Sequence, residues 1–192
     1  MGDFELKGIN HLALVSSDMA RTVDFYEGVL GMPLIKTIEL PMDTGQHFFF
    51  DCGNGDSLAF FWFADAPDAA PGIAAPANRP DTGESASAHG SMNHVAFNID
   101  ADRIEEYRER LLAAGVECSE VWNHDDSEWG LAPENHEGVF VRSVYFQDPD
   151  GILLEFAGWT RPLGQSGDVV HEPARAHPEP PVPTSPPAAP GT

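Results

Sequence analysis

The residues with the clearest potential for chemistry are two histidines and one glutamate, each in a segment that otherwise reads as a buried strand. His11 and His94 follow asparagine in NHLALV and NHVAFN, and Glu155 stands between Leu154 and Phe156 in GILLEFA. A buried carboxylate is costly unless it is paired or bound to a metal ion. We therefore interpret these three residues as candidate ligands of one metal ion.

The two histidines occupy matching positions in an internal repeat. Residues 10–31 and 93–115 both read as an alternating apolar strand, an Asp-containing turn with Asp18 or Asp102 as the expected N-cap, and a helix closed by glycine. Three strand-like segments follow each helix, at 34–40, 47–51 and 57–63 in the first half and at 116–122, 139–147 and 152–157 in the second. Each half is thus predicted to be a βαβββ module.

The expected fold class is α+β, with two βαβββ modules pairing into a curved mixed sheet around a metal-binding cleft. The first module spans residues 1–63, and an Ala-, Pro- and Gly-rich linker at 64–91 leads to the second module at 92–160. Residues 161–192 hold 9 of the 17 prolines and no Phe, Tyr or Trp, so this tail cannot build a core and is predicted to be disordered.

Composition disfavours several classes of partner and location. The chain has 31 Asp+Glu against 10 Lys+Arg, and the resulting net charge of −21 disfavours nucleic acid and anionic membrane surfaces. Its two cysteines, Cys52 and Cys118, form neither a metal-binding spacing nor a disulfide framework, so a cytoplasmic protein is expected. No apolar run reaches membrane-spanning length, and the N-terminus does not read as a signal peptide.

Two imidazoles and one carboxylate leave coordination positions of a metal ion open. When the last strands of the two modules are aligned on their preceding glycines, Ala59 stands where the other module has Glu155, so it supplies no fourth ligand. Ala13 and Ala96 leave room beside the two histidines, because residues two apart share a strand face. Such a set suits Fe(II) oxygen chemistry, and Zn, Mn or Ni could occupy the same ligands.

Residues 7–160 resemble the vicinal oxygen chelate superfamily, which includes glyoxalase I, bleomycin-resistance proteins and type I extradiol ring-cleaving dioxygenases. The resemblance rests on the paired modules and on the ligand positions. The stretch HEGVFVRSVYFQDPDGILLE at 136–155 is most similar to the extradiol dioxygenase signature. That signature places a histidine, an aliphatic residue followed by tyrosine, and a Pro-x-Gly turn ahead of a metal-binding glutamate.

The resemblance implies roles for five residues. His11, His94 and Glu155 would be the iron ligands. His136 and Tyr145 would hydrogen-bond the substrate oxygens and stabilise the developing negative charge.

One position departs from the dioxygenase pattern. The family's acid–base histidine belongs at the start of the first module's last strand, where this chain has Asp56 or Ser57. Asp56 could serve in its place if burial raised its pKa towards neutrality. His47 on the preceding strand is the other candidate.

The leading hypothesis from this resemblance is an Fe(II)-dependent extradiol-type dioxygenase that cleaves a small, catechol-like aromatic substrate with O2. One alternative is a metal-dependent lyase or isomerase of the glyoxalase or epimerase type, although such enzymes usually have a fourth ligand where Ala59 stands. Another is a non-enzymatic drug-binding protein of the bleomycin-resistance kind. The resemblance implies a homodimer, and the sequence leaves open whether the modules pair within one chain or across two.

Overall fold

The computed structural model describes residues 7–164, 168 and 170–173. The chain divides into two compact units, Met1–Pro162 and Leu163–Thr192, and the fold described below is that of the first. The predicted Pro-rich tail at 161–192 falls largely outside the described residues. Within the described residues, no helix is long and apolar enough to cross a membrane.

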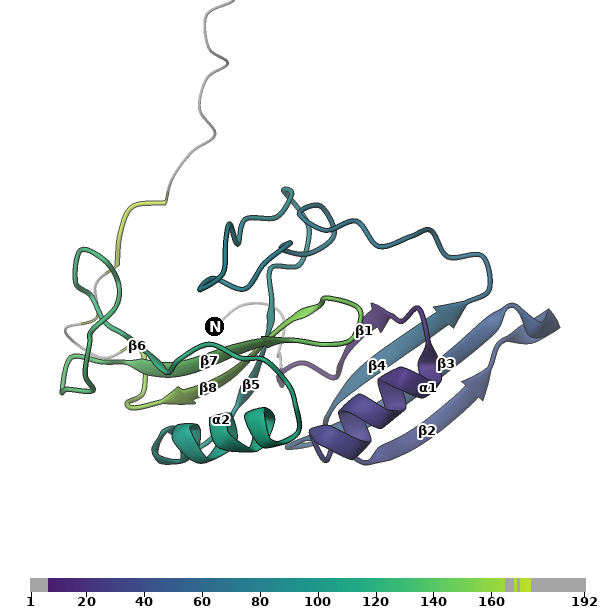
Figure 1. Cartoon of the computed structure of the whole chain (residues 1–192), viewed down its shortest axis with the longest axis horizontal. Helices are drawn as coiled ribbons and strands as arrows, with labels where there is room; N and C mark the ends of the chain where they lie inside the picture. The colour runs from purple at the N-terminus through teal and green to yellow at the C-terminus, as the bar shows by residue number, and fades with distance from the viewer. Residues whose placement is uncertain (1–6, 165–167, 169, 174–192) are drawn as a thin grey trace, which may run out of the picture. The chain divides into compact units, whose positions relative to one another are not determined.

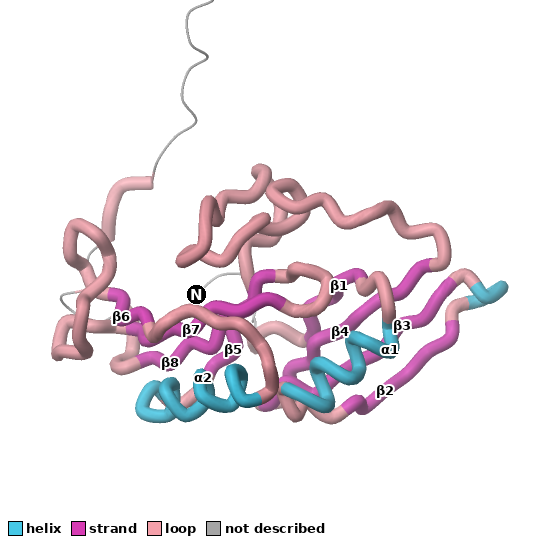
Figure 2. The backbone as a smooth tube through the Cα atoms, in the orientation of Figure 1, coloured by secondary structure: helices cyan, strands magenta, loops and turns pink. Residues whose placement is uncertain are grey.

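The first module is a four-stranded sheet with one helix (Figures 1 and 2). Its strand order is β1-β4-β3-β2, with β1 parallel to β4 and the other neighbours antiparallel. In chain order the elements are β1 (His11–Val15), α1 (Met19–Val23) continued by a π-helical segment (Asp24–Val29), β2 (Leu34–Glu39), a 3-10 turn (Pro41–Asp43), β3 (Gly45–Gly53) and β4 (Asp56–Phe63).

The second module repeats this plan, with strand order β5-β8-β7-β6 and β5 parallel to β8. Its elements are β5 (Val95–Asn98), a 3-10 turn (Ala101–Arg103), α2 (Ile104–Ala113), β6 (Trp122–His124), β7 (Val141–Gln147) and β8 (Leu153–Trp159). The predicted α+β class and the two βαβββ modules are therefore confirmed, and the strands form two separate four-stranded sheets.

The two helices begin in different ways. Asp18 is the N-cap of α1, and its side chain accepts a hydrogen bond from the backbone N–H of Arg21, as predicted. Asp102 instead lies inside the 3-10 turn that precedes α2, and the extended residue before that turn is Asp100. The predicted capping role of Asp102 is therefore wrong.

The strand predicted at 116–122 is also displaced, because the observed strand β6 is Trp122–His124. The earlier part of the segment is attached to β7 mainly through Ser119. The backbone N–H of Ser119 donates to the carbonyl oxygen of Tyr145, and the Ser119 hydroxyl accepts from the N–H of Tyr145. The hydroxyl of Ser119 thus accepts a hydrogen bond that a backbone carbonyl would accept in a regular strand ladder.

One hydrophobic cluster serves both modules. Its buried members come from α1 and its continuation, from α2, and from one face of each sheet: Met19, Phe25, Tyr26, Phe50, Leu58, Phe60, Ile104, Leu111, Val144, Phe146, Leu154 and Phe156. Alternate residues of a strand point to opposite faces of its sheet. The opposite faces, which carry His11 in the first module and Glu155 in the second, are therefore turned away from the shared core.

Candidate metal centre

His94 and Glu155 are two predicted ligands that the structure brings together. Nε2 of His94 lies 2.9 Å from Oε2 of Glu155. Ala96 of β5 is the register partner of Glu155 on β8, so His94, two residues earlier, extends the same face. The Glu155 side chain is only 7% exposed, whereas that of His94 is 34% exposed and reachable from outside.

The preceding asparagine determines which nitrogen of His94 is available to a metal ion. Nδ1 of His94 lies 2.7 Å from Oδ1 of Asn93. An amide oxygen only accepts hydrogen bonds, so Nδ1 must carry the proton and donate it. Nε2, the nitrogen next to Glu155, is then left either to hold a second proton or to bind a metal ion. Metal-binding histidines usually donate their other N–H in this way.

The first module repeats this arrangement at His11. Its Nδ1 lies 2.7 Å from Oδ1 of Asn10, and the ring packs edge-on against Phe49 with the centroids 5.7 Å apart. Among the residues that the structure describes, however, no three His, Cys, Asp or Glu side chains are grouped so as to hold a metal ion. His11 therefore does not join His94 and Glu155 within one chain.

The shared core explains this separation. The first sheet and the second sheet both pack their helix-facing sides into one cluster, and the faces that carry the predicted ligands are turned away from it. One chain thus presents two partial sites: His11 on the first sheet, and the pair of His94 and Glu155 on the second.

The electrostatics of the pair suit a metal ligand. Burial raises the pKa of Glu155, but His94, Ser143 and His124 together lower it by more, so its pKa lies below the ordinary value. The carboxylate is therefore ionised at neutral pH. An ionised carboxylate beside an imidazole supplies two of the donors that divalent transition metals favour.

Three polar side chains surround the pair on the same face of the second sheet. Tyr145 is the register partner of Glu155, and its hydroxyl lies 3.3 Å from Nε2 of His124. Burial raises the pKa of Tyr145 and lowers that of His124, so both are neutral at pH 7. The hydroxyl of Ser143 is fully buried and makes no hydrogen bond of good geometry within the described part of the chain.

His124 and Ser143 are members of this site that sequence reasoning did not select. His124 lies in β6 and is half-buried. The alternation of Trp122 with His124 was a signal for a strand face. Ser143 stands two residues before Tyr145, so strand periodicity alone places the two on one face.

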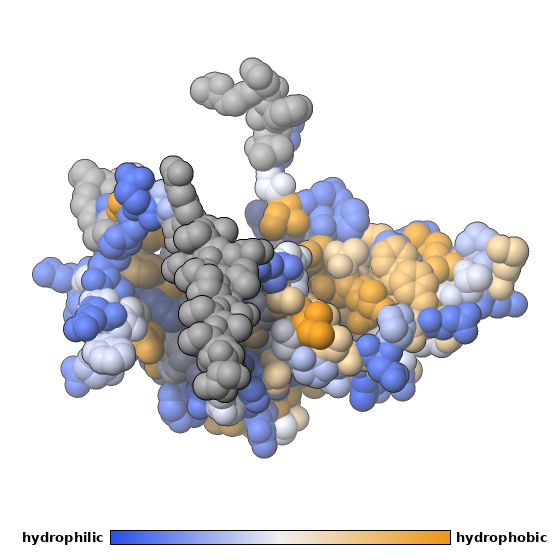
Figure 3. All heavy atoms as spheres, turned by 90° about the horizontal axis from the view of Figure 1, so that it is seen from above, coloured by the Kyte–Doolittle hydropathy of each residue, from blue (hydrophilic) through white to orange (hydrophobic). Residues whose placement is uncertain are grey.

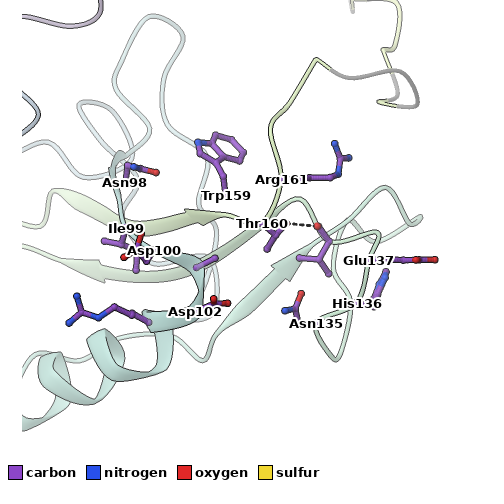
Figure 4. A pocket seen from close by; sticks show the side chains of 13 residues that line it. Asn98, Ile99, Asp100, Asp102, Asn135, His136, Glu137, Trp159, Thr160 and Arg161 are labelled. Carbon is purple, nitrogen blue, oxygen red and sulfur yellow. Dashed lines mark hydrogen bonds between the residues drawn. The ribbon is translucent and has the colours of Figure 1, made fainter.

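His136 lies elsewhere, in the loop before β7. Its Nδ1 accepts a hydrogen bond from the backbone N–H of Gly138 at 3.0 Å, and its Nε2 lies 3.3 Å from a carboxylate oxygen of Asp125. It lines a cavity of about 780 Å³ that also involves Asn98 and Trp159 (Figure 4). Asn98 and Trp159 lie at the ends of β5 and β8 that are far from His94 and Glu155, and neither His94 nor Glu155 lines the cavity.

Asp56 is placed at the start of β4. Strand alternation puts it on the side of Leu58, which belongs to the shared core, and its charge acts on the nearby Cys52. Ser57, the register partner of His11, faces the other way. This placement leaves Asp56 outside the candidate site.

Comparison with known proteins identifies relatives of this chain. Residues 8–156 match the family described as Glyoxalase/Bleomycin resistance protein/Dioxygenase superfamily. Metallothiol transferase FosB of Shouchella clausii is 26% identical over 78% of this chain and 79% of its own length. Glutathione transferase FosA of Serratia marcescens is 28% identical over the same shares of both chains.

A solved structure shares the fold. It is that of the fosfomycin resistance protein FosX from Listeria monocytogenes, complexed with Mn(II) and sulfate. It is 22% identical to this chain, covers 81% of it and 95% of its own length, and superposes with a TM-score of 0.52.

These findings correct the functional hypothesis drawn from the sequence. The curated relatives are thiol transferases, so an Fe(II)-dependent extradiol dioxygenase acting on a catechol-like aromatic substrate with O2 was the wrong prediction. The same correction covers the oxidoreductase chemistry and the iron cofactor that went with it. The alternative of a metal-dependent glyoxalase-type enzyme fits these relatives better.

Proposed function

Because the chain belongs to the Glyoxalase/Bleomycin resistance protein/Dioxygenase superfamily, we propose that it is a metal-dependent transferase that joins a thiol to a small, oxygen-bearing electrophile. The names of the relatives, metallothiol transferase and glutathione transferase, support this class of reaction. The observation that carries the metal dependence is the contact between Nε2 of His94 and Glu155, with Nδ1 of His94 committed to Asn93.

The ligands we propose for the metal are His94 and Glu155 of one chain and His11 of a second copy. When bound, a divalent metal ion polarises a substrate oxygen and stabilises the negative charge that develops there. A set of two imidazoles and one carboxylate suits Mn(II), Zn(II) and other divalent ions.

The surface around His11 supports a site shared between two copies. Val15, Ile38 and Phe63 lie on the same face of the first sheet as His11 and are 50%, 38% and 39% exposed. The molecule presents an extended apolar surface in Figure 3. Contiguous apolar patches often mark sites of protein association. Covering this face with the second module of another copy would hide the patch and complete the ligand set.

Two further side chains of the second sheet would bind the substrate. Tyr145 keeps its phenolic proton, since burial raises its pKa, and Ser143 holds a buried hydroxyl without a well-formed hydrogen bond. Both are hydrogen-bond donors next to Glu155. They would orient substrate oxygens towards the metal and stabilise negative charge on them.

The test is an assay for the joined product. Purified protein is loaded with Mn(II) or Zn(II) and incubated with glutathione and fosfomycin, the compound in the name of FosX, and mass spectrometry follows the adduct. We expect an adduct with the summed mass of both reactants only when metal is present, and none with Glu155→Gln. The matched control His136→Gln should keep full activity. An unchanged mixture across a panel of thiols and epoxides, with metal bound, would contradict the proposal.

A further inference from the structure

His47 lies in the middle of β3 on the face of the first sheet that carries His11. Its register partners are Phe61 on β4 and Ile38 on β2. The ring stacks on Phe61 with centroids 3.6 Å apart and an interplanar angle of 14°, and it packs against Phe49 at 4.3 Å. Since Phe49 also contacts the ring of His11 at 5.7 Å, the two histidines flank one phenylalanine.

The Nε2 atom of His47 is buried and has no hydrogen-bond partner in the described part of the chain. A buried polar atom without a partner costs folding free energy, and such an atom calls for an explanation. Its immediate neighbours, Phe49, Phe61 and Ile38, cannot supply a hydrogen bond. An apolar side chain would fill this position without the cost. The partner of Nε2 is therefore expected to come from outside the chain.

The surroundings keep the ring uncharged. Burial lowers the pKa of His47, and the neighbouring His11 lowers it further. Two further charged groups lie on this side of the sheet. Lys36 on β2, the register partner of Phe49, disfavours a cation, whereas Asp51 on β3, the register partner of Ser57, stands four residues from His47, whose pKa remains lowered. Phe61 on β4 and Val15 on β1 are the facing residues of the same row and carry no charge. A neutral imidazole can accept a proton at neutral pH.

We propose that His47 is the proton acceptor of the thiol-transfer reaction, an inference that rests on the proposed function. Nε2 of His47 takes the proton of the thiol as sulfur forms a bond to a substrate carbon. The C–O bond at that carbon breaks, and its electron pair stays on the departing oxygen, where a bound divalent metal ion would stabilise the negative charge. The protonated His47 then returns the proton to that oxygen, so the net reaction is addition of the thiol. His47 and His11 pack against the same phenylalanine, Phe49. The proton acceptor therefore lies near a proposed metal ligand and is not itself a ligand.

The experiment compares His47→Phe, which retains the aromatic stack, with His47→Gln and with the control His136→Phe. The measurements are kcat/KM against pH, metal affinity by titration calorimetry, and the side-chain 15N resonances of His47 in the metal-free protein. General base catalysis typically contributes about 100- to 10,000-fold. At pH 7 we expect both His47 variants to lose about 100-fold or more in kcat/KM with unchanged metal affinity, and His136→Phe to match the wild type.

The pH profile separates a proton acceptor from a packing residue. The loss of kcat/KM in the His47 variants should shrink towards pH 9. At that pH the thiol ionises by itself, because free thiols have a pKa of about 8.5. In the wild-type metal-free protein, Nε2 should be unprotonated at pH 7. Wild-type activity in His47→Phe, or a loss that is equal at all pH values, would overturn the inference while leaving the proposed function intact. A wild type that forms no adduct with any thiol would overturn both.

Discussion

The hydroxyl of Tyr26 in the first module donates a hydrogen bond of 3.1 Å to Oδ2 of Asp148 in the second. Two residues along the same turn, Asp150 accepts hydrogen bonds from the backbone N–H and the hydroxyl of Ser17, and it pairs with Arg21 at 2.6 Å. Both acids of the Asp-Pro-Asp-Gly turn thus bind the first module's helix: Asp148 binds the π-helical continuation of α1, and Asp150 binds α1 and the residue Ser17 just before its N-cap. The turn that resembled part of a dioxygenase signature joins the two modules.

The contact between Tyr26 and Asp148 predicts a pH-dependent stability. Burial raises the pKa of Asp148 to about 6, although its hydrogen bonds oppose the shift. Between its ordinary value of 3.8 and about 6, the folded protein binds a proton that the unfolded chain releases. The free energy of unfolding contributed by this group therefore falls as the pH rises through that window, by about 3 kcal/mol in all.

Asp148→Asn should remove this dependence, because an amide keeps an acceptor oxygen for the backbone donors and carries no charge. Urea denaturation of both proteins from pH 4 to pH 7.5 measures the difference. The stability of the wild type relative to the variant should decline by about 3 kcal/mol over the range. If the free energies of unfolding of the two proteins changed with pH in parallel, the pKa of Asp148 in the folded state would be the ordinary one.

The ion pair between Arg21 and Asp150 should matter less through its charge than through the hydrogen bonds of Asp150. Arg21 is 49% exposed, so Arg21→Ala is expected to cost at most about 1 kcal/mol. Asp150→Ala also leaves the N–H and hydroxyl of Ser17 without their acceptor, and it should cost about 1–3 kcal/mol. Denaturation at pH 7 distinguishes the two, and an equal loss would mean that the ion pair dominates.

Asn93→Ala tests whether the asparagine prepares His94 for metal binding. Removal of Oδ1 leaves Nδ1 of His94 without its acceptor and no longer fixes which nitrogen is protonated. Loss of such a supporting contact typically weakens metal affinity by about 10- to 100-fold. Asn98→Ala, at the far end of β5, is the control. Calorimetric titration with Zn(II) that gave equal affinities for wild type and Asn93→Ala would show that the hydrogen bond has no such role.

Local patterns predicted much of the fold. The alternation in each half and the glycines closing the helices are local signals, so the two modules, their strand order along the chain and the face shared by His94 and Glu155 were accessible from the sequence. The strand predicted at 116–122 was misplaced because the hydroxyl of Ser119 replaces a ladder partner, which periodicity does not reveal.

The site was only partly predictable for a different reason. Alternation shows that a strand has two faces, but it does not say which faces of two modules pack together. Here the helix-facing sides meet in one core, which separates His11 from the pair of His94 and Glu155. The reaction class was misjudged because the Asp-Pro-Asp-Gly turn serves module packing, as Tyr26 and Asp148 show.

The most direct test of the shared site mixes two defective variants, His11→Ala and Glu155→Ala. Each alone lacks a ligand in every site and should bind Zn(II) weakly. Mixed dimers contain one site with all three ligands, so after subunit exchange about a quarter of the wild-type number of tight sites should appear, counted by calorimetry. No gain on mixing, or undiminished tight binding by His11→Ala alone, would contradict a metal site built from two copies.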